Sequence, residues 1–186
     1  MPGDTPQEAV TAFLDPLRAA LSVLDGVGHV SVPRRGLWVK YKRVSWVLNG
    51  GNGMKLGDIG TLHASMTFRV IDTDPSTNEL GKPLRVSTLD YNYKLELPGG
   101  TDMWRMHWHP DGVSDTREPH LHIPPDLKVH RPCDRMTFEN AIRWCIRDGA
   151  PLTCSPREAE DFLTDVEAPH RLHRSWGSRA DMRLPQ

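Results

Sequence analysis

The sequence predicts an α+β domain in which an antiparallel meander sheet is covered on one face by N-terminal and C-terminal helices. Apolar residues recur at helical spacing near both ends of the chain, and they alternate with a period of two between residues 29 and 123. The connections between the alternating segments are rich in glycine, proline, asparagine and aspartate, which is typical of turns between antiparallel strands. We therefore expect one domain over residues 1–168 with about five to seven strands, followed by a basic, flexible tail over residues 169–186.

The first predicted helix covers residues 6–24. Thr5 is a candidate N-cap, Pro6 suits the first turn, and Glu8 stands where a capping box needs an acidic residue. Apolar residues then follow at helical spacing up to Leu24, and Gly26 suits the end of the helix. This helix is expected to place its apolar stripe on the sheet.

The predicted strands show the alternation most clearly in residues 61–70 and in the stretch "WRMHWHP", residues 104–110. In the second stretch Trp104, Met106 and Trp108 fall on one side, and we expect them to face the core. Arg105, His107 and His109 fall on the other side, because side chains two residues apart on a strand point the same way.

Two further helices are predicted after the strands. Thr137 can cap a helix over residues 137–148, and "SPRE", residues 155–158, is a capping box for a helix over residues 156–166. Cys145 lies on the apolar stripe of the first of these helices and is expected to be buried. The tail that follows shows no clear period.

Composition indicates a globular protein and argues against several classes. Hydrophobic residues make up 38% and charged residues 25% of the 186 residues, and no apolar run is long enough to span a membrane. The net charge of −1 does not indicate a nucleic-acid partner, and the three cysteines lack a CxxC spacing. The N-terminus does not resemble a secretory signal, so we expect a cytoplasmic protein with no membrane partner.

Histidine is concentrated in one part of the chain. Of the nine histidines, five lie between residues 107 and 130. The segment "PHLHIPP", residues 119–125, places His120 and His122 on one side of a strand. If residues 119–123 pair with residues 103–109, four imidazoles and one guanidinium share a patch, and the ten-residue connection between the strands can form a flap over it.

Proton-transfer catalysis is the first interpretation of this patch. One imidazole can act as a base while a second, protonated one acts as an acid, and an arginine can hold a phosphate. This set of side chains can cleave RNA by activating the 2′-hydroxyl of the RNA itself, without any cofactor. We assign Arg105 to the phosphate, His107 and His120 to the acid–base pair, and His109 and His122 to orienting the phosphate.

Additional substrate contacts are expected around the patch. Tyr91 and Tyr93 share one face of the preceding strand and can stack a base, and His130 is a further candidate contact. In the tail, Arg174 and Trp176 belong to a basic and aromatic group that suits single-stranded RNA.

Metal binding is the second interpretation. Zinc is held readily by three histidines and a water molecule, and His120, His122 and His130, or the two HxH pairs, can supply these ligands. The third interpretation is a solvated sheet face that is merely rich in histidine. The sequence leaves the three interpretations open.

Four short motifs give the chain a resemblance to a known family. The order "YNYKLEL", "WRMHWHP", "PHLHI" and "TFENAIRW" resembles the TumE-like toxins of bacterial toxin–antitoxin pairs over residues 89–146. The chain is longer than these toxins, and Met106 and His107 stand where the family has an acidic residue after the arginine. The resemblance implies a toxin that acts on RNA and is neutralised by a cognate antitoxin protein, with Arg105, His120 and His122 as candidate functional positions.

Overall fold

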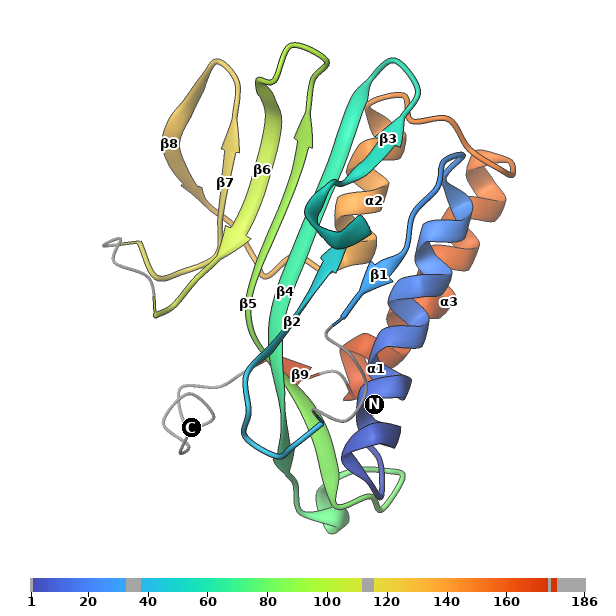
Figure 1. The fold of residues 1–186 in the computed structure, drawn as a ribbon, viewed down its shortest axis with the longest axis vertical. Coiled ribbons are helices and arrows are strands. Elements are labelled where there is room, and N and C mark those ends of the chain that lie inside the picture. Colours follow the sequence, from blue (N-terminus) through green and yellow to red (C-terminus); the bar gives the residue numbers. More distant parts are fainter. Residues whose placement is uncertain (1, 33–37, 112–115, 174, 177–186) are drawn as a thin grey trace.

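The computed structural model describes residues 2–32, 38–111, 116–173 and 175–176. It contains the helices α1 (Pro6–Ala20), α2 (Phe138–Arg147) and α3 (Pro156–His173), and the short 3-10 helices η1 (Leu21–Val23), η2 (Asn49–Gly51) and η3 (Pro75–Thr77). Figure 1 shows the three α-helices together on one side of a twisted sheet. The predicted fold class is confirmed.

Within the described part of the chain, the sheet contains eight antiparallel strands and one short parallel strand. The strands are β1 (Val30–Ser31), β2 (Val44–Leu48), β3 (Met54–Leu56), β4 (Gly60–Asp72), β5 (Leu84–Glu96), β6 (Asp102–Trp108), β7 (His120–Ile123), β8 (Asp126–Pro132) and β9 (Ser175–Trp176). Their order is β1-β2-β4-β5-β6-β7-β8; β3 pairs with β4, and β9 runs parallel to β5. From β4 onward the strands follow chain order, so β6, β7 and β8 are consecutive neighbours.

The sheet extends beyond the predicted limit at residue 123. The chain reverses through Pro124 and Pro125, and β8 then pairs with β7 so that Ile123 lies opposite Asp126. Most of β8 is exposed on both faces of the sheet. Without a buried face a strand has no reason to alternate apolar and polar residues, so the sequence pattern did not reveal it.

Helix α3 is longer than predicted, and the first part of the predicted tail, residues 169–173, is helical. The buried face of this extension carries Glu167 and His170 where a hydrophobic residue would be usual. Hydrophobic periodicity is therefore interrupted although the helix continues. The other helix predictions are confirmed, since α1 with η1 covers residues 6–23 and α2 covers residues 138–147.

Local capping explains where the helices begin. The Thr5 hydroxyl accepts a hydrogen bond from the Glu8 N–H, and the Glu8 carboxylate accepts one from the Asp4 N–H. At the start of α3 the pair is reciprocal: the Ser155 hydroxyl accepts a hydrogen bond from the Glu158 N–H, and the Glu158 carboxylate accepts one from the Ser155 N–H. These bonds satisfy N–H groups that the first turn of a helix leaves without partners.

The core lies between the helices and one face of the sheet, which we call the inner face. Trp104, Met106 and Trp108 are buried there, as predicted. The Trp104 ring packs edge-on against Trp144 of α2 with 5.7 Å between centroids, and its Nε1–H donates to the Asp148 carboxylate at 2.7 Å. Because alternate residues of a strand point to opposite faces, this packing directs Arg105 and His107 to the outer face.

No helix among the described residues is long and apolar enough to cross a membrane.

Candidate metal centre

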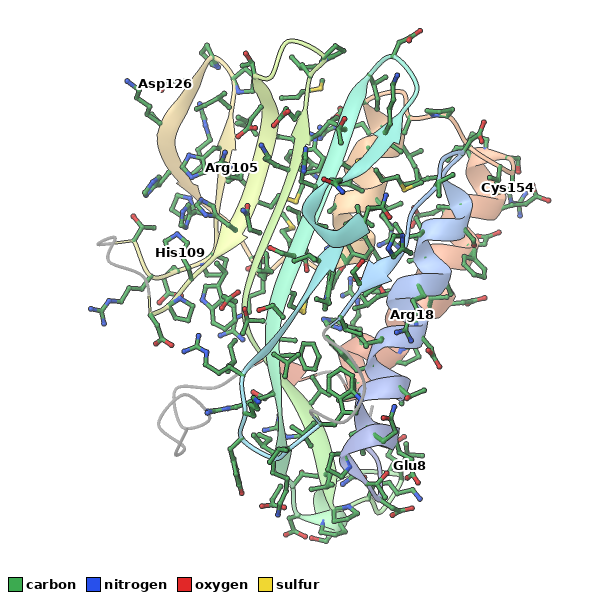
Figure 2. All side chains as sticks on the ribbon, in the orientation of Figure 1. Glu8, Arg18, Arg105, His109, Asp126 and Cys154 are labelled. Atoms are coloured by element: carbon green, nitrogen blue, oxygen red, sulfur yellow. The ribbon has the colours of Figure 1, made fainter. Side chains whose placement is uncertain are left out.

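Strand pairing brings the two HxH segments together on the outer face. The β6–β7 register sets Arg105 opposite His122 and His107 opposite His120, which confirms the predicted pairing of residues 103–109 with 119–123. Figure 2 shows Arg105 and His109 on the β6–β8 side of the molecule, away from Arg18 and Glu8 on α1.

Five imidazoles form one contiguous group, which we call the histidine cluster: His107, His109, His120, His122 and His130. The His107 ring lies 4.1 Å from the His120 ring and 4.7 Å from the His122 ring, between centroids. His130 joins from β8, stacked on His120 at 4.5 Å. The cluster therefore depends on three neighbouring strands.

His120 lies at the centre of the cluster and is fully buried. Its Nδ1 is 2.7 Å from the backbone carbonyl oxygen of Glu118. Because a carbonyl oxygen only accepts hydrogen bonds, Nδ1 carries the hydrogen and Nε2 carries a lone pair. That Nε2 is buried and has no hydrogen-bond partner within the described part of the chain.

The same argument assigns the ring nitrogens of two neighbours. His122 Nδ1 is 2.7 Å from the carbonyl oxygen of Leu127 and must donate to it, so His122 Nε2 also has a lone pair. His107 Nε2 lies 2.6 Å from His122 Nε2, and between two neutral rings it must be the donor of this bond. His130 Nδ1 lies 2.6 Å from the hydroxyl oxygen of Thr116.

Among the described residues, two sets of three histidines have ring nitrogens close enough to share a metal ion. In each set, one nitrogen per residue lies within 4.8 Å of the others. We call His107, His109 and His120 the outer triad, and His120, His122 and His130 the inner triad. In the inner triad every Nδ1 is already within hydrogen-bond distance of a protein oxygen, which is the arrangement that orients metal-binding histidines in proteins.

The surroundings of the cluster disfavour protonated imidazoles. Burial, and then the positive charges of the neighbouring histidines and Arg105, lower the pKa of His107 to about 3. Burial is also the main cause that lowers the pKa values of His120 and His122, although their bonds to backbone carbonyls act in the opposite direction. At neutral pH these rings are uncharged and keep the lone pairs that a metal ion needs.

Arg105 is half-exposed and forms an ion pair with Asp102. Leu95 pairs with Trp104 and Glu96 with Asp102, so Met103 is an extra residue in β6. This β-bulge moves Asp102 onto the same face as Arg105, where regular alternation would have separated them. The guanidinium predicted to hold a phosphate is therefore already balanced by a carboxylate.

Tyr91 and Tyr93 are not part of the site, and their predicted contact with substrate is wrong. Both are buried on the inner face, where their rings stack at 4.9 Å and Tyr91 pairs with Trp108. The Tyr91 hydroxyl oxygen accepts a hydrogen bond from the Met136 N–H at 2.9 Å. The signal was present in the sequence, because both tyrosines alternate with Asn92 and Lys94 and so share the phase of the apolar residues.

The remaining predictions for this region have mixed outcomes. His130 lies in the cluster. Arg174, the side chain of Trp176 and part of the predicted flap lie outside the described residues. Sequence reasoning missed Asp102 and Thr116, as well as the carbonyl groups that orient His120 and His122, because none of these belongs to a recognisable motif.

The chain matches no protein-family model, no curated protein and no solved structure. The resemblance to TumE-like toxins therefore stays a prediction.

Proposed function

We propose that this protein binds a transition-metal ion of the zinc class in the histidine cluster, with the inner triad as the preferred ligands. One observation carries the proposal. The His120 imidazole is fully buried, its Nδ1 is fixed by the Glu118 carbonyl, and its Nε2 has no hydrogen-bond partner among the described residues while four other imidazoles surround the ring.

A buried polar atom without a partner is unfavourable, and a metal ion would remove this cost. Leaving such a group unpaired typically costs about 1–3 kcal/mol. A metal bond to Nε2 satisfies the lone pair, and the hydrogen bond from Nδ1 to a carbonyl fixes the ring in the tautomer that the metal requires. His122 is oriented in the same way by Leu127.

The donor set selects the class of metal. Nitrogen-only ligands favour zinc, copper, nickel and cobalt over magnesium and calcium, which prefer oxygen. Three histidines leave one position for a water molecule, which a zinc ion activates when it is bound. Zn–N bonds are about 2.0–2.1 Å long, and the three ring nitrogens lie within 4.8 Å of one another, so they are near enough to converge on one ion.

Direct metal binding tests the proposal. Purified protein is stripped with a chelator, dialysed, and titrated with Zn²⁺, Co²⁺ and Ni²⁺, while bound metal is measured by elemental analysis and Co²⁺ by its visible spectrum. We expect binding in the wild type and in His29→Ala, which changes an exposed histidine outside the cluster, and weaker binding in His122→Ala. No binding in the wild type, or equal loss in His29→Ala and His122→Ala, would contradict the proposal.

RNA cleavage without a metal is a second candidate. It is supported by the position of Arg105 beside His122 in the β6–β7 register, where a phosphate can reach both groups. The ion pair of Arg105 with Asp102 weighs against it. Incubation of purified protein with RNA in excess EDTA separates the candidates: persistent cleavage that is lost in a folded Arg105→Ala variant favours proton transfer, and cleavage that stops favours the metal.

The toxin role and a cognate antitoxin protein as its partner are a proposal that rests on the motif resemblance alone, whereas RNA as a partner also rests on the position of Arg105 beside His122. A cytoplasmic location likewise stays a proposal from the sequence. Expression in bacteria without any partner tests the role. Growth that stops in the wild type and recovers in His120→Ala supports it, whereas unimpaired growth of cells that contain the folded wild-type protein contradicts it.

A further inference from the structure

We infer that the histidine cluster holds one metal ion at a time and passes it between two triads that share His120. The inference rests on the proposed metal site and adds to it a stoichiometry and a movement of the ion. The outer and inner triads have His120 in common, so an ion can exchange two ligands while it keeps the third.

The chemistry of His120 limits the cluster to one ion. Its Nδ1–H is committed to the Glu118 carbonyl at 2.7 Å, so the ring offers a single lone pair, on Nε2. Bridging two metals would require loss of the Nδ1 hydrogen, and the ring nitrogen would then face a carbonyl oxygen with no hydrogen between them. Two ions therefore cannot both use His120.

The bond between His107 and His122 couples the two triads. His122 Nε2 accepts a hydrogen bond from His107 Nε2 at 2.6 Å. An ion on the inner triad occupies the lone pair of His122 Nε2 and so breaks the hydrogen bond from His107. An ion on the outer triad leaves that hydrogen bond in place. Occupation of one triad thus changes the ligands of the other.

The two ends of the cluster differ in their access to solvent. His109 lines a cavity of 220 Å³ together with Asp90 and Asp111, whose two carboxylates outnumber the single guanidinium of Arg43. Such a cavity favours a hydrated cation over an anion. At the other end, His130 is exposed on β8. An ion can therefore enter or leave at either end, beside His109 or at His130, and cross between the ends at the buried His120, which suits a protein that takes up and hands on a metal ion.

Stoichiometry in paired variants tests the sharing of His120. The variants are His107→Ala with His109→Ala, which removes the outer pair, His122→Ala with His130→Ala, which removes the inner pair, and His120→Ala. Each is titrated with Zn²⁺ and examined by native mass spectrometry after its melting temperature is measured. We expect one ion in the wild type, one in each double variant, with weaker binding when the inner pair is lost, and none in His120→Ala.

Any other result contradicts either the shared site or the proposed metal site. Two ions in the wild type, or loss of binding in a folded double variant, would overturn the shared site, and so would one ion in a folded His120→Ala protein. No binding in the wild type would instead reject the proposed metal site itself. Should His120→Ala fail to fold, the two double variants and the wild type still decide the question.

Release kinetics test the movement of the ion. Zinc-loaded protein is mixed with an excess of a chromogenic chelator, and the rate of zinc transfer is followed by stopped flow. We expect faster release from the wild type than from the outer-pair double variant, because stepwise ligand exchange offers a second route. Equal or slower release from the wild type would overturn the transfer between triads.

Discussion

The two faces of β6 serve opposite purposes although their residues alternate along one short strand. On the inner face, Trp104 and Trp108 are buried under α2 and the segment before it, and the Trp104 indole N–H has a carboxylate partner. On the outer face, His107 and His109 both contact His120 of β7, and His130 of β8 stacks on the same ring. The first face buries apolar surface, and the Trp104 indole N–H on it has a hydrogen-bond partner. The second face gathers imidazole rings, and on the central ring, His120, the hydrogen bond made by Nδ1 leaves a lone pair on Nε2.

This difference separates stability from function along the strand. Apolar burial on the inner face contributes to the free energy of folding. On the outer face, crowded imidazoles contribute little to it, because burial lowers their pKa values and His120 Nε2 is buried without a hydrogen-bond partner among the described residues. We therefore expect that the two faces can be perturbed independently.

The largest effect is expected on the inner face. Trp104→Ala removes a buried indole and its hydrogen bond to Asp148, and it should lower the free energy of unfolding by about 3–5 kcal/mol. Chemical denaturation measures the loss, and zinc titration of the remaining folded protein should give an unchanged affinity. If the folded Trp104→Ala protein also bound zinc more weakly, with a loss of binding free energy as large as the loss of stability, the two faces would be coupled.

Metal should stabilise the protein only through the outer face. Zinc at one hundred times its dissociation constant is expected to raise the free energy of unfolding by about 2.7 kcal/mol, because it binds the folded state. Thermal melting with and without EDTA measures the gain, and the His120→Ala variant serves as the control. A similar gain in that variant would locate the stabilising metal elsewhere.

A smaller effect is expected from the groups that orient the ligands. Thr116→Val removes the hydroxyl group beside His130 Nδ1 while keeping a similar shape, and it should weaken zinc binding about 10–100-fold. Competition with a coloured chelator measures the affinity. Thr101→Val, in the exposed turn before β6, is the matched control; an identical loss in both variants would remove Thr116 from the site.

Near neutral pH the smallest effect is expected from the protonation of His107 without metal, because this effect grows only as the pH falls below 6.5. The pKa of His107 is depressed from 6.5 to about 3, so as pH falls the unfolded chain takes up this proton before the folded protein does. The contribution of His107 is fully present above pH 6.5 and is lost as pH falls toward 3. Denaturation in EDTA at several pH values should show a shallower decline in His107→Gln than in the wild type; parallel curves would contradict the expected burial.

Some features of the site could be predicted because they depend on local periodicity. The alternation of Trp104 and Met106 with Arg105 and His107 assigned each residue to the core or to the outer face before any pairing was known. Two HxH segments in succession then made a shared patch the simplest arrangement. Capping residues such as Thr5 marked the helix starts for the same local reason.

Other features depend on contacts between distant segments. Alternation along β5 already puts Tyr91 and Tyr93 on its apolar side, but only the β5–β6 register sets them opposite Trp108 and Met106. Asp102 reached Arg105 through the extra residue at Met103, which no periodic pattern predicts.

The sequence by itself determined the fold class, the core side of β6 and the set of histidines, since each follows from the order of apolar and polar residues along a few neighbouring positions. Only the tertiary structure decided that β8 exists as a strand, that His130 joins the cluster, and that the carbonyl groups of Glu118 and Leu127 leave lone pairs on His120 and His122. The physical reason is that backbone carbonyl groups are the same at every residue. Which imidazole they meet is set by strand register and by the turn at Pro124 and Pro125, and these depend on the whole sheet.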